Sequence, residues 1–413
     1  MEIIDKTSSI FFATFSRYEK GKRQPTNGMV DPVLSFLLPK VRSLVLLDTP
    51  HLVSDSIEPI IEVYNDQRLS SRFILSKFWY FLIYLFCTRP STSETRISYK
   101  VRDFISVLLV AFTQKGSYDV FIGLESVFAL AGIVLKKLGK VKTVVYYVSD
   151  YAPNRYKNKA FNALYLLLDR FCLRHCDYTW DVSPAMQKGR IQAGLPNAGI
   201  YRVIHVPNGL FPSQIASLPI AKRDKNDLVY MGILQSDMGP DLAIKAFGVV
   251  LKIYPKMKLH IIGGSQKDSR IYKAMAKRLR LEKSILFHGF IQDNTEMAKI
   301  VRRCYIGLAP YRAFPDSWRW FGDAGKIRQY TAAGLPVVTT QVPPLGRFIV
   351  SQGAGIMTTD TVKSFSNGIL LLLSDFALYK KLSRGAQKVS KDNTWEHVYS
   401  KALSDMKAMR STI

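Results

Sequence analysis

The stretch Phe321–Thr340, FGDAGKIRQYTAAGLPVVTT, has residue types and spacing suited to binding an anion. A glycine-punctuated start leads into a short helix predicted from Lys326 to Ala333, which Gly334 and Pro336 end. A helix N-terminus offers unpaired N–H groups and a positive dipole end, and a lysine on the first turn adds a charge. The stretch is therefore either a phosphate-binding helix that leads into a buried strand or an ordinary α/β connection.

Two acidic residues in the first half of the chain follow predicted strands. Asp150 ends the run VKTVVYYVSD, so its carboxylate would lie at the carboxyl end of a strand, where open α/β sheets bind ligands. A carboxylate there can act as a general base towards a hydroxyl group. Glu125 has the analogous position in GLES. Both also suit structural roles, Asp150 as a turn or cap residue and Glu125 as a charge at a helix N-terminus.

The elements that must position these residues repeat in two halves. Apolar and β-branched runs alternate with amphipathic segments, which is typical of parallel α/β sheets. A region rich in Pro, Ser and Lys at 207–227 separates the halves. We expect an α/β protein of two Rossmann-like, doubly wound domains, 1–210 and 211–392, with a ligand cleft between them. A last helix within 393–413 is expected to pack back on the first domain.

The charge of the chain favours an anionic partner. Its 413 residues include 58 Lys and Arg against 32 Asp and Glu, a net charge of +26. This excess suits a nucleic acid, an anionic membrane surface or a phosphorylated substrate. The basic residues are dispersed and no nucleic-acid-binding signature is present, so a nucleic acid is the least favoured partner. Four scattered cysteines fit a reducing compartment, and Cys172, His175 and Cys176 on one helix face suit packing better than a metal site.

One aromatic segment could contact a membrane. Residues 73–87, FILSKFWYFLIYLFC, are too short to span a bilayer comfortably and include Lys77. They suit either a helix that lies in the membrane interface or a buried helix. The N-terminal residues do not form a secretory signal. We therefore expect a cytoplasmic protein, peripherally associated with the cytosolic face of the membrane.

Several pieces of the chain, in order from about 119 to 340, resemble nucleotide-sugar glycosyltransferases of the GT-B type. They are similar to the group 1, or family 4-like, enzymes and more closely to the membrane-associated glucuronosyltransferase family of xanthan biosynthesis. The pieces that carry the resemblance are Glu125-Ser126, Ser149-Asp150, VSPAM at 182–186, APY at 309–311, and the K-x-x-Q-Y pattern of Lys326, Gln329 and Tyr330.

The resemblance implies transfer of a sugar from a nucleotide diphosphate sugar, most simply a UDP-sugar, to a hydroxyl of a lipid-linked or other glycan acceptor. It implies no metal and no further cofactor. Asp150 resembles the base that deprotonates the acceptor, and Lys326 resembles the lysine that neutralises the departing diphosphate. Glu125 would be a second acid of the site. The remaining donor-binding residues that we expect are Gly232, Gly263, Tyr311, Asp323, Gln329 and Tyr330.

The chain also departs from the broad retaining families. Their two basic residues in the first loop of the second domain correspond to Ile233 and Met238 here, and their paired acids to Phe321 and Gln329. The candidates to replace the missing charges are Arg312, Lys267 and Arg328. The departures favour inversion with Asp150 as base. A retaining transferase, a nucleotide-sugar epimerase on the same fold, and a basic nucleic-acid-binding protein are the alternatives.

Overall fold

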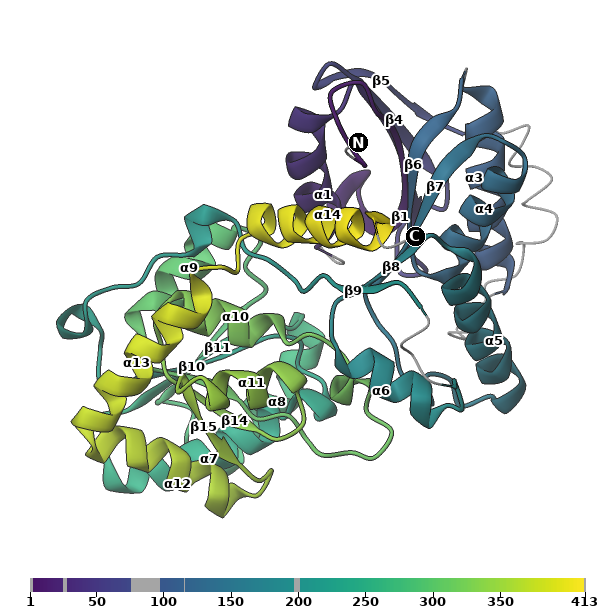
Figure 1. Ribbon diagram of the computed structural model, residues 1–413. Coiled ribbons are helices and arrows are strands. Elements are labelled where there is room, and N and C mark those ends of the chain that lie inside the picture. The colour runs from purple at the N-terminus through teal and green to yellow at the C-terminus, as the bar shows by residue number, and fades with distance from the viewer. Residues whose placement is uncertain (1–2, 25–27, 76–96, 115, 197–200, 412–413) are drawn as a thin grey trace. The chain divides into compact units, whose positions relative to one another are not determined.

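The computed structural model describes residues 3–24, 28–75, 97–114, 116–196 and 201–411. The chain forms two compact units. Unit 1 comprises Met1–Val206 and Tyr399–Ile413, and unit 2 comprises Pro207–Val398. Each unit is an α/β structure built on its own sheet (Figure 1).

Unit 1 is built on a nine-stranded sheet of order β5-β4-β3-β1-β6-β7-β8-β9, with β2 paired to β1. Its strands are β1 (Ser9–Glu19), β2 (Lys22–Gln24), β3 (Ser43–Pro50), β4 (Ile60–Asn65), β5 (Arg68–Ile74), β6 (Tyr118–Leu124), β7 (Val141–Val148), β8 (Tyr178–Asp181) and β9 (Val203–His205). The run from β3 through β1 to β9 is parallel, as the alternating pattern predicts.

The edges of this sheet correct two sequence predictions. β4 and β5 add antiparallel, because short connections join β3, β4 and β5 without a crossover helix. Residues 73 and 74 belong to strand β5 rather than to a helix, and residues 76–87 of that predicted helix lie outside the described residues. On the other side of β3, strand β1 continues to Glu19, β2 follows, and a helix starts at Val30.

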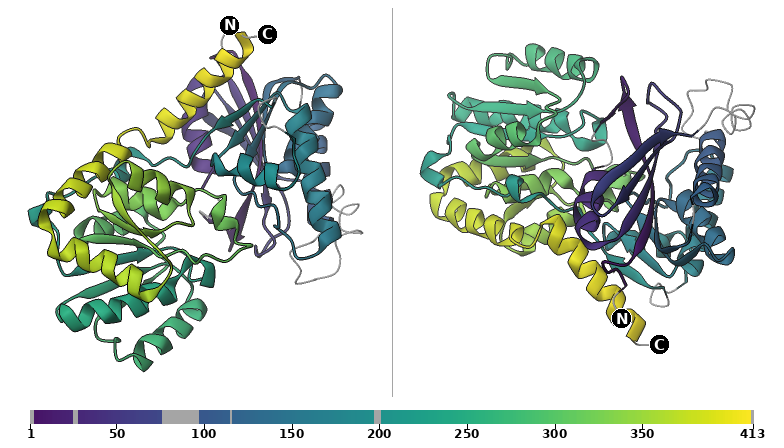
Figure 2. Two further views of the ribbon diagram at one scale, coloured as in Figure 1. Left: turned by 60° about the horizontal axis from the view of Figure 1, so that its bottom comes forward. Right: turned by 90° about the horizontal axis from the view of Figure 1, so that it is seen from above.

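The helices of unit 1 cover both faces of its sheet. They are α1 (Val30–Leu37), α3 (Ile97–Thr113), α4 (Ser126–Lys137), α5 (Lys159–His175), α6 (Ala185–Gln192) and α14 (Trp395–Ser411), of which the residues from Tyr399 on belong to unit 1. Successive strand residues point to opposite faces. Tyr146 donates a hydrogen bond to Asp169 of α5, whereas the ring of Tyr147 packs on Tyr399 of α14. Figures 1 and 2 show α3, α4 and α5 together along one side of the sheet.

Unit 2 has a six-stranded parallel sheet of order β12-β11-β10-β13-β14-β15. The strands are β10 (Asp227–Met231), β11 (Lys258–Ile262), β12 (Ile285–Gly289), β13 (Ile306–Ala309), β14 (Val337–Thr340) and β15 (Gly355–Thr358). The helices are α7 (Pro240–Ile253), α8 (Gln266–Arg278), α9 (Asn294–Arg303), α10 (Gly325–Ala332), α11 (Pro344–Ser351), α12 (Val362–Ser374) and α13 (Phe376–Ser390).

Two apolar clusters hold unit 2 together, one on each face of its sheet. One contains residues of α7, α8 and α12, and the other contains residues of α9, α10 and α11. The sequence predictions missed α11 and β15, which follow β14 directly. Within the described residues, no helix is long and apolar enough to span a membrane.

The helix α10 ends where its sequence predicts. Gly334 has a positive φ of 72°, a conformation that glycine adopts without strain. Its N–H bonds to the carbonyl of Thr331, and the N–H of Leu335 bonds to that of Tyr330, which satisfies the last turn. Pro336 then leads into the buried strand β14.

Candidate functional site

Three neighbouring strands of unit 2 end beside the start of α10. Gly232 follows the end of β10, Gly263 follows β11, and Pro310-Tyr311 follows β13. The two glycines have positive φ values of 134° and 113°. A Cβ at Gly263 would lie 2.3 Å from the carbonyl oxygen of Gly232, and a Cβ at Gly232 would lie 3.1 Å from Cε of Lys326. The lack of a side chain at Gly232 leaves room for Lys326, and the lack of one at Gly263 lets this loop approach the backbone of Gly232.

Lys326 is the central basic residue of this region. Its side chain lies on the first turn of α10 and is only 5% exposed. Nζ lies 4.1 Å from the centre of the Tyr230 ring and 4.7 Å from that of Tyr311. It has no hydrogen-bond partner among the described residues. Burial, and then the charge of Arg319, lower the pKa of Lys326 well below its ordinary value, and Asp237 opposes them only in part.

Arg319 is a second basic residue of the same region, and the sequence analysis missed it. It lies on a short 3₁₀ turn, Trp318–Trp320, where its guanidinium stacks 3.5 Å from the Trp318 ring centre. Its Nε donates to Asp237 at 3.0 Å. Its Nη2 is buried without a hydrogen-bond partner within the described part of the chain. The sequence offered one signal, a basic residue seven positions before Lys326. That signal was not enough to identify Arg319, because its partner Asp237 lies 82 positions away in the chain.

The three substitutes expected for the missing basic residues lie elsewhere. Arg328 makes a two-pronged bond to Asp323, at 2.8 and 2.9 Å. Arg312 bonds to the carbonyl of Asp360, and Lys267 lies exposed on the first turn of α8. None of the three brings a free basic group to Lys326 in the described structure, whereas Arg319 interacts with it electrostatically.

Several expected donor-binding residues have structural contacts. Asp323 accepts from both Arg328 and the backbone N–H of Asn208, at 2.9 Å for the latter. Tyr330 is fully buried, and its hydroxyl accepts from the N–H of Met231 and donates to the carbonyl of Leu308. The Tyr330 hydroxyl therefore bonds to two backbone groups, and a donor-binding role for Tyr330 stays a prediction.

The remaining expected residues lie around Lys326. Tyr311 is buried and places its ring beside the Lys326 ammonium, so it contacts the lysine through its face. Gln329, one turn into α10, is half-buried. Gly232 and Gly263 line the loops described above.

The arrangement in unit 2 can bind a polyanion. Nζ of the buried Lys326 and Nη2 of the part-buried Arg319 have no hydrogen-bond partner among the described residues. A buried cation without a partner is costly, and a bound anion would relieve that cost. The cap residue of α10, Ala324, supplies no side-chain bond to the first turn, which leaves the helix N-terminus to other acceptors. Adjacent phosphoryl groups match two neighbouring cations and a helix N-terminus.

In unit 1, Glu125 and Ser149-Asp150 lie at the carboxyl ends of the adjacent strands β6 and β7. Glu125 has a φ of 71°, which is strained for a residue other than glycine. Its Oε1 accepts from the hydroxyl of Ser149 at 2.6 Å and from its N–H at 3.2 Å. The strained residue Glu125 therefore makes the contact that fixes the loop carrying Asp150.

Asp150 is half-buried and has Arg155 beside it. Nη1 of Arg155 donates to the Asp150 carbonyl at 2.9 Å. Burial disfavours the charged guanidinium, but the charges of Glu125, Tyr165 and Asp150 outweigh it and raise the pKa of Arg155. The carboxyl end of this sheet thus presents two carboxylates, and the cation of Arg155 interacts with both.

A fully buried ion triad joins α5, α6 and the end of β8. Arg190 of α6 bonds to Asp169 at 2.9 Å and to Asp181 at 2.5 Å. The hydroxyl of Tyr146 donates to Asp169 at 2.8 Å, and the guanidinium lies 4.9 Å from the Tyr151 ring centre. Burial alone would lower the pKa of Arg190, but the two carboxylates raise it well above its ordinary value. Every strong charge in this triad is paired.

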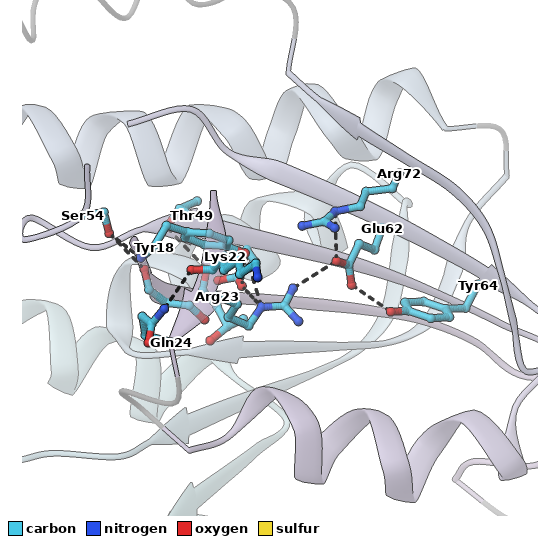
Figure 3. Close-up of polar contacts among 12 residues, drawn as sticks. Tyr18, Lys22, Arg23, Gln24, Thr49, Ser54, Glu62, Tyr64 and Arg72 are labelled. Atoms are coloured by element: carbon cyan, nitrogen blue, oxygen red, sulfur yellow. Dashed lines mark hydrogen bonds and ion pairs between the residues drawn. The ribbon is translucent and has the colours of Figure 1, made fainter. Parts of the chain in front are cut away.

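A second charged cluster joins β2 to the antiparallel edge of the sheet (Figure 3). Arg23 contacts Asp48 at 2.6 Å and Glu62 at 3.2 Å. Tyr18 donates to Asp48, and Tyr64 donates to Glu62. Burial raises the pKa of Asp48, and Arg23 opposes the shift. These contacts hold the short β2 hairpin against the sheet.

Metal ligands do not cluster in the described residues: no group of three or more His, Cys, Asp or Glu side chains could hold an ion. Cys172 is buried within α5 and its thiol donates to the carbonyl of Ser126, while His175 stacks on Phe171. These contacts agree with a packing role.

The two units together define the GT-B fold of nucleotide-sugar glycosyltransferases, which comparison with solved structures supports. Residues 217–389 match the family model of "Glycosyl transferases group 1". This match lies within unit 2 and includes Lys326 and Arg319.

Curated relatives match part of the chain. A glycogen synthase of Mycobacterium tuberculosis is 26% identical over 207 residues, which is 48% of this chain and 47% of the relative. A mannosylfructose-phosphate synthase of Agrobacterium fabrum is 28% identical over 184 residues, 42% of this chain and 38% of the relative. The chain thus aligns with about half or less of the length of these relatives.

Solved structures match along nearly the whole chain. A sucrose-phosphate synthase from Thermosynechococcus elongatus superimposes with a TM-score of 0.72 at 12% identity, covering 98% of this chain and all of the other. The Anabaena protein Alr3699/HepE, solved in complex with UDP-glucose, gives 0.63 at 15% identity, covering 98% and 100%. At this identity the similarity is one of fold.

Proposed function

We propose that the protein transfers a sugar from a nucleotide diphosphate sugar to a hydroxyl of a lipid-linked glycan acceptor, in the assembly of a polysaccharide at the cytosolic face of a membrane. The observation that carries the proposal is the buried Lys326, whose Nζ has no hydrogen-bond partner in the described structure, beside Arg319, whose Nη2 has none either. The group 1 domain around them supports a sugar donor as the source of the anion.

Unit 2 would hold the donor through its diphosphate. Nζ of Lys326 and Nη2 of Arg319 would bind phosphoryl oxygens, with the N-terminus of α10 behind them. The negative charge on the diphosphate grows as the bond to the sugar breaks, so these cations stabilise the transition state more than the bound donor. UDP is the preferred nucleotide, because Alr3699/HepE was solved in complexes with UDP and UDP-glucose.

Unit 1 would prepare the acceptor. The carboxylate of Asp150 would take the proton of the acceptor hydroxyl as its oxygen attacks the anomeric carbon from the face opposite the diphosphate, so the configuration inverts. Glu125 holds the loop through Ser149, and Arg155 places a positive charge near Glu125 and Asp150. In this mechanism Glu125 and Arg155 are positioning residues.

A two-part experiment tests the proposal. A thermal-shift panel of nucleotides and nucleotide sugars identifies the donor, because a ligand that binds only the folded state raises its stability. Transfer is then assayed with that donor and a membrane extract as acceptor, for the wild type and Asp150→Asn. We expect turnover to fall by about 10² to 10⁴-fold in the variant, while donor affinity changes little. Substantial turnover by Asp150→Asn would refute the base assignment, and no stabilisation by any nucleotide would refute the donor site.

A further inference from the structure

The helix α5 has an outward face that is apolar. Its exposed side chains include Leu164 at 55%, Leu167 at 61% and Phe171 at 36% exposure. With the exposed Ala160 and Ala163 they lie at spacings of three and four residues, so they form one stripe along the helix. Single exposed leucines are normal on protein surfaces, but a continuous stripe on one helix needs an explanation.

The charges around this stripe have one sign. Exposed cationic or potentially cationic side chains lie at both ends of the helix: Lys159 at the start, and Arg174 and His175 at the end. The one acidic residue of α5, Asp169, is buried against Arg190. The outward face of α5 thus combines apolar residues with positive charges and no exposed acid.

A helix of unit 2 shows that this pattern is not general. α8 also exposes a large apolar residue, Ile271 at 68%, but its neighbours on the exposed surface are Lys267, Asp268, Arg270 and Lys273. That surface carries both signs of charge, as is usual for a solvated helix.

We propose that the outward face of α5 is the surface by which unit 1 docks on an anionic membrane. Leu164, Leu167 and Phe171 enter the interface, and Lys159 and Arg174 face lipid phosphates, the pattern of a helix that lies in the plane of a bilayer surface. The inference rests on the membrane-bound acceptor proposed above, and it assigns the docking to a different segment from the 73–87 stretch.

The contacts of the preceding loop connect this face to Asp150. Asn162 of α5 accepts from the N–H of Tyr156 and donates to the carbonyl of Pro153. The ring of Tyr156 packs edge-on against Phe161 at 4.6 Å. The loop that carries Asp150 is therefore attached to the first turns of α5, so docking would hold Asp150 at a fixed height above the lipid headgroups.

The test is flotation of the full chain with vesicles of equimolar phosphatidylglycerol and phosphatidylcholine, and with vesicles of phosphatidylcholine alone. We expect the wild type to float with the anionic vesicles, and the double variant Leu164→Ser/Leu167→Ser to bind them at least about 10-fold more weakly. The matched control is Ile253→Ser/Ile271→Ser, which removes comparably exposed residues from unit 2 and should bind within about 2-fold of the wild type.

A spectroscopic variant tests insertion itself. Leu167→Trp should show a blue shift of its emission with anionic vesicles when compared with the wild-type protein, and Ile271→Trp should not. Equal vesicle binding by the wild type and Leu164→Ser/Leu167→Ser would overturn the proposal. So would a concentration-dependent dimer, without vesicles, that the same double variant abolishes, because a second copy would then cover the stripe. UDP titration of the double variant separates this inference from the donor site, since α5 does not belong to unit 2.

Discussion

The buried cations of the two units differ in their partners. Arg190 in unit 1 is held by two carboxylates, at 2.9 and 2.5 Å, and the hydroxyl of Tyr146 completes the network. Lys326 in unit 2 is equally buried but has two aromatic rings and another cation as neighbours. A paired buried cation maintains the fold, whereas an unpaired one costs stability and is explained by a ligand.

The largest effect expected from this comparison is on folding. Arg190→Met leaves Asp169 and Asp181 buried without a counter-charge, so the free energy of unfolding should fall by about 3–5 kcal/mol. Lys326→Met removes a buried cation that has no hydrogen-bonded counter-charge in the described structure, so it should leave stability unchanged or raise it. Chemical denaturation of the two variants measures both values. Equal losses of stability would show that Lys326 is a structural residue like Arg190.

The next largest effect is on nucleotide binding. Lys326→Met should weaken UDP binding by about 10 to 100-fold, because a charge-assisted contact to phosphate in a buried site is lost. Arg190→Met, where it remains folded, should bind UDP as the wild type does. Isothermal titration calorimetry measures both affinities, and a reversed result would exchange the roles of the two cations.

A smaller effect distinguishes Arg319, which pairs with Asp237 through Nε but leaves Nη2 without a hydrogen-bond partner in the described structure, from Arg312. Arg319→Gln should weaken UDP binding by about 10-fold, since it removes the unused Nη2 donor but retains a polar side chain. The matched control is Arg312→Gln, whose native side chain bonds to Asp360, and its effect should stay within about 2-fold. Similar losses for both variants would mean that the positive charge of unit 2 acts only at long range.

The smallest effect is a proton linked to binding. Burial and Arg319 lower the pKa of Lys326 in the free protein, and a bound diphosphate would raise it. Between these two pKa values the complex binds more protons than the free protein, so UDP affinity should fall as pH rises through that window. Calorimetry in two buffers of different ionisation enthalpy, above the last pKa of UDP, should show uptake of up to one proton. Lys326→Met should lose this uptake, and an unchanged uptake would assign the proton to another group.

The sequence predicted those parts of the fold that depend on local patterns. The alternation of apolar strands and amphipathic helices gave the parallel core of both sheets, and Gly334 with Pro336 gave the end of α10. The antiparallel β4 and β5 were not predicted, because the apolar pattern of a short strand does not encode its direction. The helix α11 and strand β15 were also missed.

The sequence predicted only the part of the candidate site that depends on local patterns. Lys326 could be found because its helix start and stop are adjacent in the sequence. Arg319 could not, because its role depends on Asp237 in a distant loop and on burial, which a single sequence does not display. The resemblance suggests that Asp323 binds the donor, and this role stays a prediction; in the structure its carboxylate accepts from Arg328 and Asn208.

The most direct test of the central claim is calorimetric titration of the full chain with UDP and with uridine, for the wild type and Lys326→Met. If Lys326 binds the diphosphate, UDP should bind the wild type much more tightly than uridine does, and the variant should lose most of that difference while its affinity for uridine stays the same. Retention of the full preference for UDP in Lys326→Met would contradict the account.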